Sequence, residues 1–222
     1  MNLSKKINTF FALMLFILIT SFILFFKSYN HKNFIAVGDL KQNRCWIYLC
    51  GLTSDINADQ EKTNRKILNE IGKELNLKFL AIKPTYRDKN FDNKLSWPHY
   101  NKTETLATYK KILSSIGNLK IVGWIGFSNG GFFLNNLAQI KELNAPIISI
   151  GSAGCFYNAN KKNYIHFLIG VDDKYHYKHT LNLFNQIISQ KSKLSASLSV
   201  FSSGHEINKP SLKKCLQTII ST

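Results

Sequence analysis

A single serine, Ser128, stands in the pentapeptide GFSNG of residues 126–130, between an apolar segment and a segment of helical periodicity. The pattern G-x-S-x-G in this position is typical of a sharp strand-to-helix turn that holds a serine hydroxyl clear of the backbone. Glycines on either side let strand and helix approach closely. We therefore interpret Ser128 as a candidate nucleophile. The alternative is an ordinary glycine-rich connection between a strand and a helix.

A serine hydroxyl needs a base to accept its proton, so a nucleophilic Ser128 requires a histidine. His205 lies in SSGHEI, after the last predicted strand and before the last predicted helix, and we take it as the base. The other histidines have simpler interpretations. His166 lies within an apolar strand, His176 and His179 begin a helix and are expected to face solvent, His31 adjoins the N-terminal segment and His99 lies in a loop.

An acid that orients this histidine should precede it and follow a strand. Asp172 and Asp173 follow the apolar segment IHFLIGV at the end of a predicted strand. Adjacent side chains there point in different directions, so only one of the two can orient His205. The residues alone leave both aspartates open.

The order of Ser128, the aspartates and His205 along the chain resembles that of the α/β-hydrolase superfamily. The motifs GFSNGG, GVDD and GHEI are together similar to those of its small carboxylesterase, acyl-thioesterase and dienelactone-hydrolase branches. By the G-x-x-D pattern of GVDD, the resemblance implies Asp173 as the acid, with Asp172 as the alternative. Dienelactone-type enzymes use a cysteine nucleophile, so the serine favours ordinary esters or thioesters.

Acyl transfer also needs N–H donors where negative charge develops on the substrate oxygen. The resemblance implies that the amide of Asn129, the residue after the nucleophile, supplies one donor. The second is expected from Leu52, which follows Gly51 in WIYLCGLTSD, with Thr53 as the next choice. Family members often have His-Gly where this chain has Cys50 and Gly51. A backbone donor does not depend on that lost side chain.

Apolar β-branched segments alternate with segments of helical periodicity over the rest of the chain. Strands are predicted at 34–37, 45–50, 77–82, 121–125, 147–150, 164–169 and 198–201, and helices at 58–75, 103–116, 130–143, 175–190 and from 210 onward. This alternation indicates an α/β fold with a doubly wound, mostly parallel sheet and helices on both faces. We expect one minimal hydrolase domain at 33–222, without a cap domain. Its acyl or alcohol pocket is expected from loops 88–100 and 151–163.

Residues 1–32 carry a different signal, because Lys5 and Lys6 precede an uncharged apolar run from Ile7 to Phe26. This length is close to the ~20 residues of a bilayer-spanning helix. No small-x-small cleavage site follows closely, which favours a retained signal anchor over a signal peptide that is cleaved to release a secreted protein. A basic amino terminus that stays inside predicts a membrane-anchored domain on the non-cytoplasmic side, either periplasmic or extracellular.

The net charge of +16 comes almost entirely from lysine, because only Arg44, Arg65 and Arg87 are arginine. No basic block is interleaved with aromatic residues, so no nucleic acid is expected as a partner. The cysteines, which are Cys45, Cys50, Cys155 and Cys215, show neither zinc-ligand spacing nor a disulfide scaffold. We therefore expect no metal and no cofactor, and the oligomeric state is unspecified.

The favoured function is a serine hydrolase that cleaves a carboxylic ester or thioester of a small-molecule or lipid-like substrate through an acyl-enzyme intermediate. The triad would be Ser128, Asp173 and His205, with the membrane as a partner through the N-terminal helix. Acyl transfer to another alcohol would use the same residues. The alternative is a catalytically silent hydrolase-like domain that acts as a membrane-tethered binding protein for lipid or envelope polymer.

Overall fold

The computed structural model is built around a seven-stranded β-sheet in the order β1-β3-β2-β6-β7-β8-β9. Every neighbouring pair from β3 to β9 is parallel, and only β1 runs antiparallel to its neighbour β3. The strands are β1 (Phe34–Gly38), β2 (Arg44–Leu49), β3 (Lys78–Ile82), β6 (Lys120–Phe127), β7 (Ile147–Ile150), β8 (Asn163–Gly170) and β9 (Leu194–Phe201). The predicted mostly parallel sheet is confirmed.

The structure describes residues 34–53, 55–98, 101–152, 154, 162–189 and 194–221, together with Met14. The chain divides into two units, residues 1–33 and 34–222. Within the part of the chain that is described, no helix has the length and apolar character needed to cross a membrane. The predicted anchor at residues 1–32 lies outside the described residues apart from Met14, so it stays a prediction.

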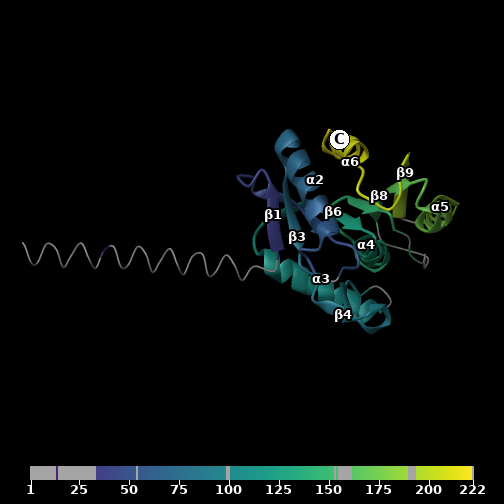
Figure 1. Cartoon of the computed structure of the whole chain (residues 1–222), viewed down its shortest axis with the longest axis horizontal. Coiled ribbons are helices and arrows are strands. Elements are labelled where there is room, and N and C mark those ends of the chain that lie inside the picture. The colour runs from purple at the N-terminus through teal and green to yellow at the C-terminus, as the bar shows by residue number, and fades with distance from the viewer. Residues whose placement is uncertain are drawn as a thin grey trace, which may run out of the picture. The chain divides into compact units, whose positions relative to one another are not determined.

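Helices cover both faces of the sheet (Figure 1). They are α2 (Asp59–Leu75), α3 (Lys102–Ile116), α4 (Asn129–Ile140), α5 (Lys174–Ser189) and α6 (Lys209–Ile220). On one face α2 and α6 pack against each other, and on the other α3 packs against α4. Helix α5 packs against β8 and β9. Each predicted helix is therefore present, with ends that differ by a few residues.

The strands of the sheet centre are buried on both faces, which is why they lack polar alternation in the sequence. In β2 every residue from Cys45 to Leu49 is buried, and the largest fully buried side chains in the described core are Trp46, Tyr48, Phe79, Phe133 and Phe167. Although β1 and β2 are consecutive in the chain, β3 lies between them in the sheet.

A short hairpin that the sequence did not indicate follows β3. It consists of β4 (Tyr86–Asp88), the 3-10 turn η1 (Lys89–Phe91) and β5 (Lys94–Ser96), in a stretch expected to be a loop. Strands of this length show no measurable period, which explains why they were missed. A bridge between Thr53 and Leu95 joins the hairpin to the segment after β2.

The register of the sheet brings the carboxyl ends of its strands to one edge. Leu49 of β2 pairs with Gly126 of β6, and Phe127 pairs with Ile150 of β7. Further along the sheet, Gly170 of β8 pairs with Phe201 of β9. The residues that follow these strands therefore meet at one edge, where ligands of open α/β sheets generally bind.

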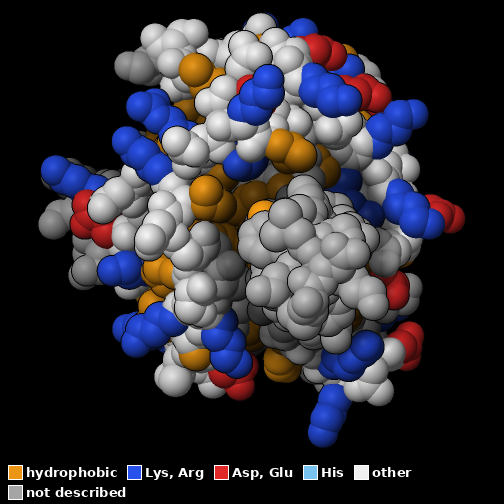
Figure 2. Space-filling model, turned by 90° about the vertical axis from the view of Figure 1, so that its left-hand side faces the viewer, with side chains coloured by type: hydrophobic (Ala, Val, Ile, Leu, Met, Phe, Trp, Pro, Cys, Tyr) orange, Lys and Arg blue, Asp and Glu red, His pale blue; other side chains and the backbone are white. Residues whose placement is uncertain are grey.

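Lysine and arginine side chains are spread singly over the face shown in Figure 2, with acidic side chains between some of them. Where described residues are visible on this face, they form no continuous basic stripe of the kind that follows a nucleic-acid backbone. The distribution on this face agrees with the interpretation of the charge as a lysine-rich, solvated surface.

Candidate active site

Ser128 occupies a strained turn between β6 and α4. Its backbone angles are φ 51° and ψ −118°, a combination that residues with a side chain rarely adopt. A Cβ atom on Gly126 would lie 2.5 Å from the carbonyl oxygen of Gly130, so the turn tolerates no side chain there. The backbone N–H of Ser128 donates to the carbonyl of Ile150 at 2.8 Å. These contacts hold Ser128 in the geometry that its motif predicts.

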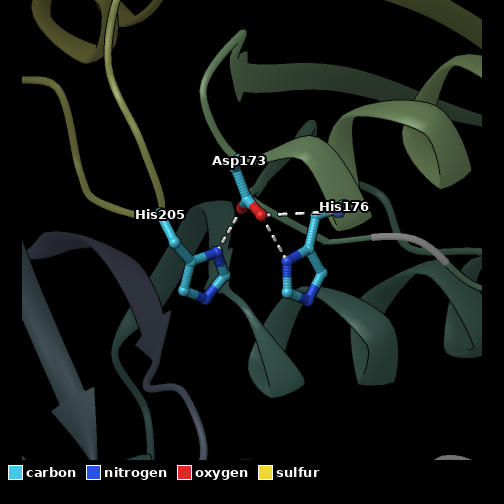
Figure 3. A group of neighbouring side chains, drawn as sticks. All are labelled: Asp173, His176 and His205. Atoms are coloured by element: carbon cyan, nitrogen blue, oxygen red, sulfur yellow. Dashed lines mark hydrogen bonds and ion pairs between the residues drawn. The ribbon is translucent and has the colours of Figure 1, made fainter.

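The acid and the histidine come from the loops after β8 and β9. The Nδ1 atom of His205 donates to Oδ2 of Asp173 at 2.5 Å (Figure 3). The two loops are also joined by the backbone N–H of Asp172, which donates to the carbonyl of Ser203 at 3.0 Å. Asp173 is buried, whereas Asp172 is exposed. The aspartate bound to His205 is thus the one that the G-x-x-D pattern selects.

His205 lies beside the strained turn. Its ring centroid is 4.9 Å from that of Phe127, the residue immediately before Ser128. Gly151 lies beneath the imidazole with φ at +54°, and a Cβ atom there would approach Nδ1 of His205 to 3.0 Å. Asp173 and His205, which are far apart in the chain, therefore meet next to Phe127, the last residue of β6 before Ser128.

A second histidine binds the same carboxylate. The Nδ1 atom of His176 donates to Oδ1 of Asp173 at 2.8 Å, and its ring stacks on that of His205 with centroids 4.3 Å apart and planes 19° apart. The prediction that His176 faces solvent is wrong, because only 21% of its side chain is exposed. Asp173 directly precedes α5, so a side chain three residues later returns to it. The D-x-x-H spacing at the start of a helix was the signal to look for.

The two other histidines that the structure describes, His166 and His179, have partners elsewhere. His166 bonds to the hydroxyls of Ser197 and Ser199 on the neighbouring strand, in agreement with its interpretation as a satisfied strand residue. His179 is exposed and its ring contacts Tyr175. His31 and His99 lie outside the described residues.

The Asp173 carboxylate accepts from two imidazoles, and its Oδ1 also accepts from the backbone N–H of His176 at 3.4 Å. Burial alone would raise its pKa, but the hydrogen bonds from His176 and His205, together with their charges, lower the pKa below its ordinary value of 3.8. An ionised carboxylate only accepts hydrogen bonds, so the Nδ1 atom of each ring carries the hydrogen. Nε2 is then the nitrogen of each ring that is left to exchange a proton, as a triad base requires.

The residues expected to bind the oxyanion line one cavity with Ser128. This cavity of about 420 Å³ is lined by Leu52, Phe91, Ser128, Asn129, Phe132, Tyr175 and His176. A Cβ atom on Gly51 would lie 3.2 Å from Cβ of Ser128, so the loop after β2 packs directly on the turn. The amide of Thr53 donates instead to the carbonyl of Leu95 at 3.1 Å. Thr53 is thereby excluded as the second donor, and Leu52 stays the proposed one.

Two side chains, those of Trp97 and Glu61, fix the loop that carries Leu52, and Trp97 also binds Asn129. The indole N–H of Trp97 donates to the carbonyl of Cys50 at 2.9 Å, and the backbone N–H of Trp97 donates to Oδ1 of Asn129 at 2.6 Å. In addition, Oε1 of the buried Glu61 accepts a hydrogen bond from the backbone N–H of Gly51 at 3.3 Å. Trp97 belongs to the loop 88–100 that was expected to form the pocket, but it is buried and joins the two segments that supply the expected oxyanion donors.

The aromatic lining of the cavity was mostly missed. Phe91 comes from a loop that was expected to form the pocket, whereas Phe132 and Tyr175 come from α4 and α5. Helical residues at apolar spacing are ordinarily core residues, so their sequence carried no signal of this role. Most of the other expected pocket loop, 151–163, lies outside the described residues.

Cys50 is the thiol nearest the expected oxyanion loop. It is buried, and burial raises its pKa well above the ordinary 9.0. Cys45 and Cys215 are also free, and burial raises the pKa of their thiols to about 11 and about 12. These thiols therefore stay protonated and unreactive at neutral pH. Cys155 lies outside the described residues.

Asp173, His176 and His205 could also hold a metal ion, since their ligand atoms lie within 4.8 Å of one another. A carboxylate with two imidazoles is a donor set that suits zinc. The sequence did not indicate the set because Asp173 and His176 follow β8, whereas His205 follows β9. As they stand, however, each carboxylate oxygen already accepts from one imidazole, so the three groups satisfy one another without an ion.

No protein-family model matches the sequence. No curated protein matches it either. Solved structures with this fold include a carboxylesterase from Bacillus cereus, with a TM-score of 0.62 and 12% identity over 89% of this chain and 98% of that chain. Acyl-protein thioesterase 2 from Zea mays has a TM-score of 0.58 and 13% identity over 86% and 100%. The capsule O-acetyltransferase of Neisseria meningitidis serogroup A has a TM-score of 0.52 and 16% identity over 85% and 91%.

These similarities show that the chain has the fold of the esterase and thioesterase structures, as the resemblance in sequence motifs implied. The fold is shared by proteins described as a carboxylesterase, a thioesterase and an acetyltransferase. Because one fold hosts several reactions, the reaction of this chain has to be argued from its site.

Proposed function

We propose that this chain is a serine hydrolase that cleaves a carboxylic ester or thioester through an acyl-enzyme intermediate. The observation that carries the proposal is the position of His205, which binds the Asp173 carboxylate and packs on Phe127 next to the strained Ser128. Acyl transfer by a serine requires a nucleophile, a base and an acid that orients the base.

In the proposed reaction, Oγ of Ser128 attacks the carbonyl carbon while Nε2 of His205 accepts its proton. The amides of Leu52 and Asn129 donate to the oxygen on which negative charge develops, and the Asp173 carboxylate stabilises the imidazolium. His205 then protonates the departing alcohol or thiol. Water attacks the acyl-enzyme, gives its proton to His205, and the free acid leaves as Ser128 regains its hydrogen.

The apolar lining supports a small acyl group as the part of the substrate that enters the cavity. Phe91 and Tyr175 are 44% and 66% exposed, so they form an open rim rather than a closed pocket. The esterase and thioesterase structures of this fold agree with a small-molecule or lipid-like ester as substrate. Transfer of the acyl group to another alcohol would use the same proton transfers, with that alcohol in place of water.

The test is turnover of p-nitrophenyl esters and acyl thioesters of increasing chain length by the full chain and by Ser128→Ala. Alanine keeps the Cβ atom and hence the same backbone constraint, so the variant removes the hydroxyl alone. Ser114→Ala, at an exposed position on α3, is the matched control. We expect turnover with the control and none above background with Ser128→Ala. Equal turnover by the two variants would overturn the proposal.

We also propose that residues 1–32 anchor the chain in a membrane, with the hydrolase domain at 33–222 on the non-cytoplasmic side. The support is the uncharged run from Ile7 to Phe26 behind Lys5 and Lys6. Carboxyl-terminal fusions to a reporter active only outside the cytoplasm should give signal, and the full chain should resist extraction from membranes by alkaline carbonate. A silent reporter would contradict the orientation, and release by carbonate would contradict the anchor.

A further inference from the structure

Asp173 binds two imidazoles, each through its Nδ1 atom. Its two carboxylate oxygens accept from Nδ1 of His176 at 2.8 Å and from Nδ1 of His205 at 2.5 Å. Figure 3 shows each ring turning one nitrogen toward the carboxylate and the other away from it. The same carboxylate therefore fixes the orientation and the tautomer of both rings.

His176 also reaches the cavity on which Ser128 opens. Together with Leu52 and Asn129, it lines the cavity of about 420 Å³. The ring is held from its other sides by Phe132 and Tyr175, with centroids 6.3 Å and 5.1 Å away. A histidine that only fixed the acid would have no need to face the cavity.

We propose that His176 is a second proton acceptor of this site, so that one carboxylate serves two alternative bases. The proposal rests on the proposed serine-hydrolase function. When His176 acts as the base, the proton of Ser128 Oγ, or of the attacking water, passes to Nε2 of His176. The imidazolium then returns the proton to the leaving group or to Ser128, so no net proton is gained or lost.

Only one of the two rings carries the extra proton at a time. Two stacked imidazolium ions with centroids 4.3 Å apart repel each other, and a single carboxylate compensates a single positive charge. The rings therefore act as alternatives, and either can hold the proton while the other stays neutral.

The competing explanation is that His176 only positions Asp173. Asparagine separates the two roles, because its amide can donate to Asp173 from the place of Nδ1 but cannot accept a proton. If the role is positional, His176→Asn preserves function where His176→Ala does not. If His176 accepts protons, asparagine cannot replace it once His205 is absent.

The experiment compares His205→Ala with the double variant His205→Ala/His176→Asn in the full chain, with turnover of a p-nitrophenyl ester as the readout. Loss of a general base costs about 10²–10⁴-fold, and we expect His205→Ala to retain at least about tenfold more activity than the double variant. Equal activities of the two variants would overturn the inference.

His179→Asn in the same His205→Ala background is the matched control. His179 lies on the same helix and contacts Tyr175 but makes no hydrogen bond to Asp173 in the described structure, so its change should leave the residual activity as it is. Thermal unfolding of every variant checks that the fold is kept. Labelling of the unaltered protein by a fluorophosphonate separates the two failures. An unlabelled protein refutes the hydrolase itself, whereas a labelled protein with equal variants refutes only the second acceptor.

Discussion

The indole N–H of Trp97 donates a hydrogen bond to the backbone carbonyl of Cys50 at 2.9 Å. Through this bond, a residue that follows the hairpin of β4 and β5 fixes the loop that leads to Leu52. The backbone N–H of Trp97 holds the side chain of Asn129 at the same time. One buried residue, which is not among those lining the cavity, therefore binds both segments that carry the expected oxyanion donors.

We expect Trp97→Phe to lower kcat with little change in KM. Phenylalanine can keep the ring contact with Phe133 but loses the bond to Cys50, and the oxyanion forms only in the transition state. The loss in kcat should be about tenfold, smaller than the ~10²–10³-fold cost of removing a donor itself. Steady-state kinetics on the best ester of the panel measures it.

Trp46→Phe is the control for this prediction, because Trp46 is equally buried while its indole N–H has no hydrogen-bond partner in the described structure. Its kcat should stay close to that of the unaltered protein. If the two variants lose the same activity, positioning by the Trp97 hydrogen bond is refuted.

Replacement of Asp173 by asparagine should lower kcat by about 10³–10⁴-fold, because the amide no longer stabilises an imidazolium and no longer enforces the tautomer. An asparagine also has one acceptor oxygen where the carboxylate offers one to each histidine. Asp172→Asn, at the exposed neighbouring position, is the matched control and should keep its activity. Comparable losses in both variants would show that the acid has been assigned to the wrong residue.

The strained backbone at Ser128 should lower the free energy of unfolding of the protein. A non-glycine residue in such a conformation costs about 1–3 kcal/mol, more than the roughly 0.4–1 kcal/mol by which glycine favours the unfolded chain. Ser128→Gly should thus have a free energy of unfolding about 1 kcal/mol higher than Ser128→Ala. Denaturant unfolding of the two inactive variants gives the difference, and a less stable glycine variant would argue against a strained turn.

The buried Glu61 should make stability depend on pH. Burial raises the pKa of its carboxyl, whereas hydrogen bonds from Tyr48, Gly51 and Asn64 lower it. The effect of burial is the larger, so the pKa lies above the ordinary 4.5. The folded protein then binds this proton more tightly than the unfolded chain. The contribution of Glu61 to the free energy of unfolding is therefore full below the unfolded pKa and falls as pH rises through the folded pKa.

Glu61→Gln removes that titration. Urea unfolding of both proteins from about pH 4 to about pH 7 should show the unaltered protein losing stability relative to the variant as pH rises. A relative gain with rising pH would mean that the folded state favours the charged form, in contradiction to the burial of this carboxyl.

The fold and the turn at Ser128 could be predicted because local sequence patterns specify them. Apolar segments such as 121–125 and 147–150 indicate buried parallel strands by themselves, and the turn around Ser128 is specified by five adjacent residues. Asp173 could be chosen because its spacing from Gly170 is also local. These features need no knowledge of what lies across the sheet.

Most of the missed features depend on contacts between distant segments. Trp97 forms hydrogen bonds with Cys50 and Asn129, which are far from it in the chain, and no sequence spacing predicts these bonds. His176 was assigned to solvent although its D-x-x-H spacing from Asp173 is local; only its stacking on His205 depends on a distant segment. The β4 and β5 strands are too short for any period and are stabilised by the bridge from Leu95 to Thr53.

The measurement that bears most directly on the central claim is the intact mass of the protein after reaction with a fluorophosphonate, followed by peptide mapping. The account predicts one adduct for each chain, located on Ser128, and none on Ser128→Ala. Folded protein that gains no adduct, or that carries it on another residue, would contradict a serine nucleophile at this turn and favour a silent binding domain instead.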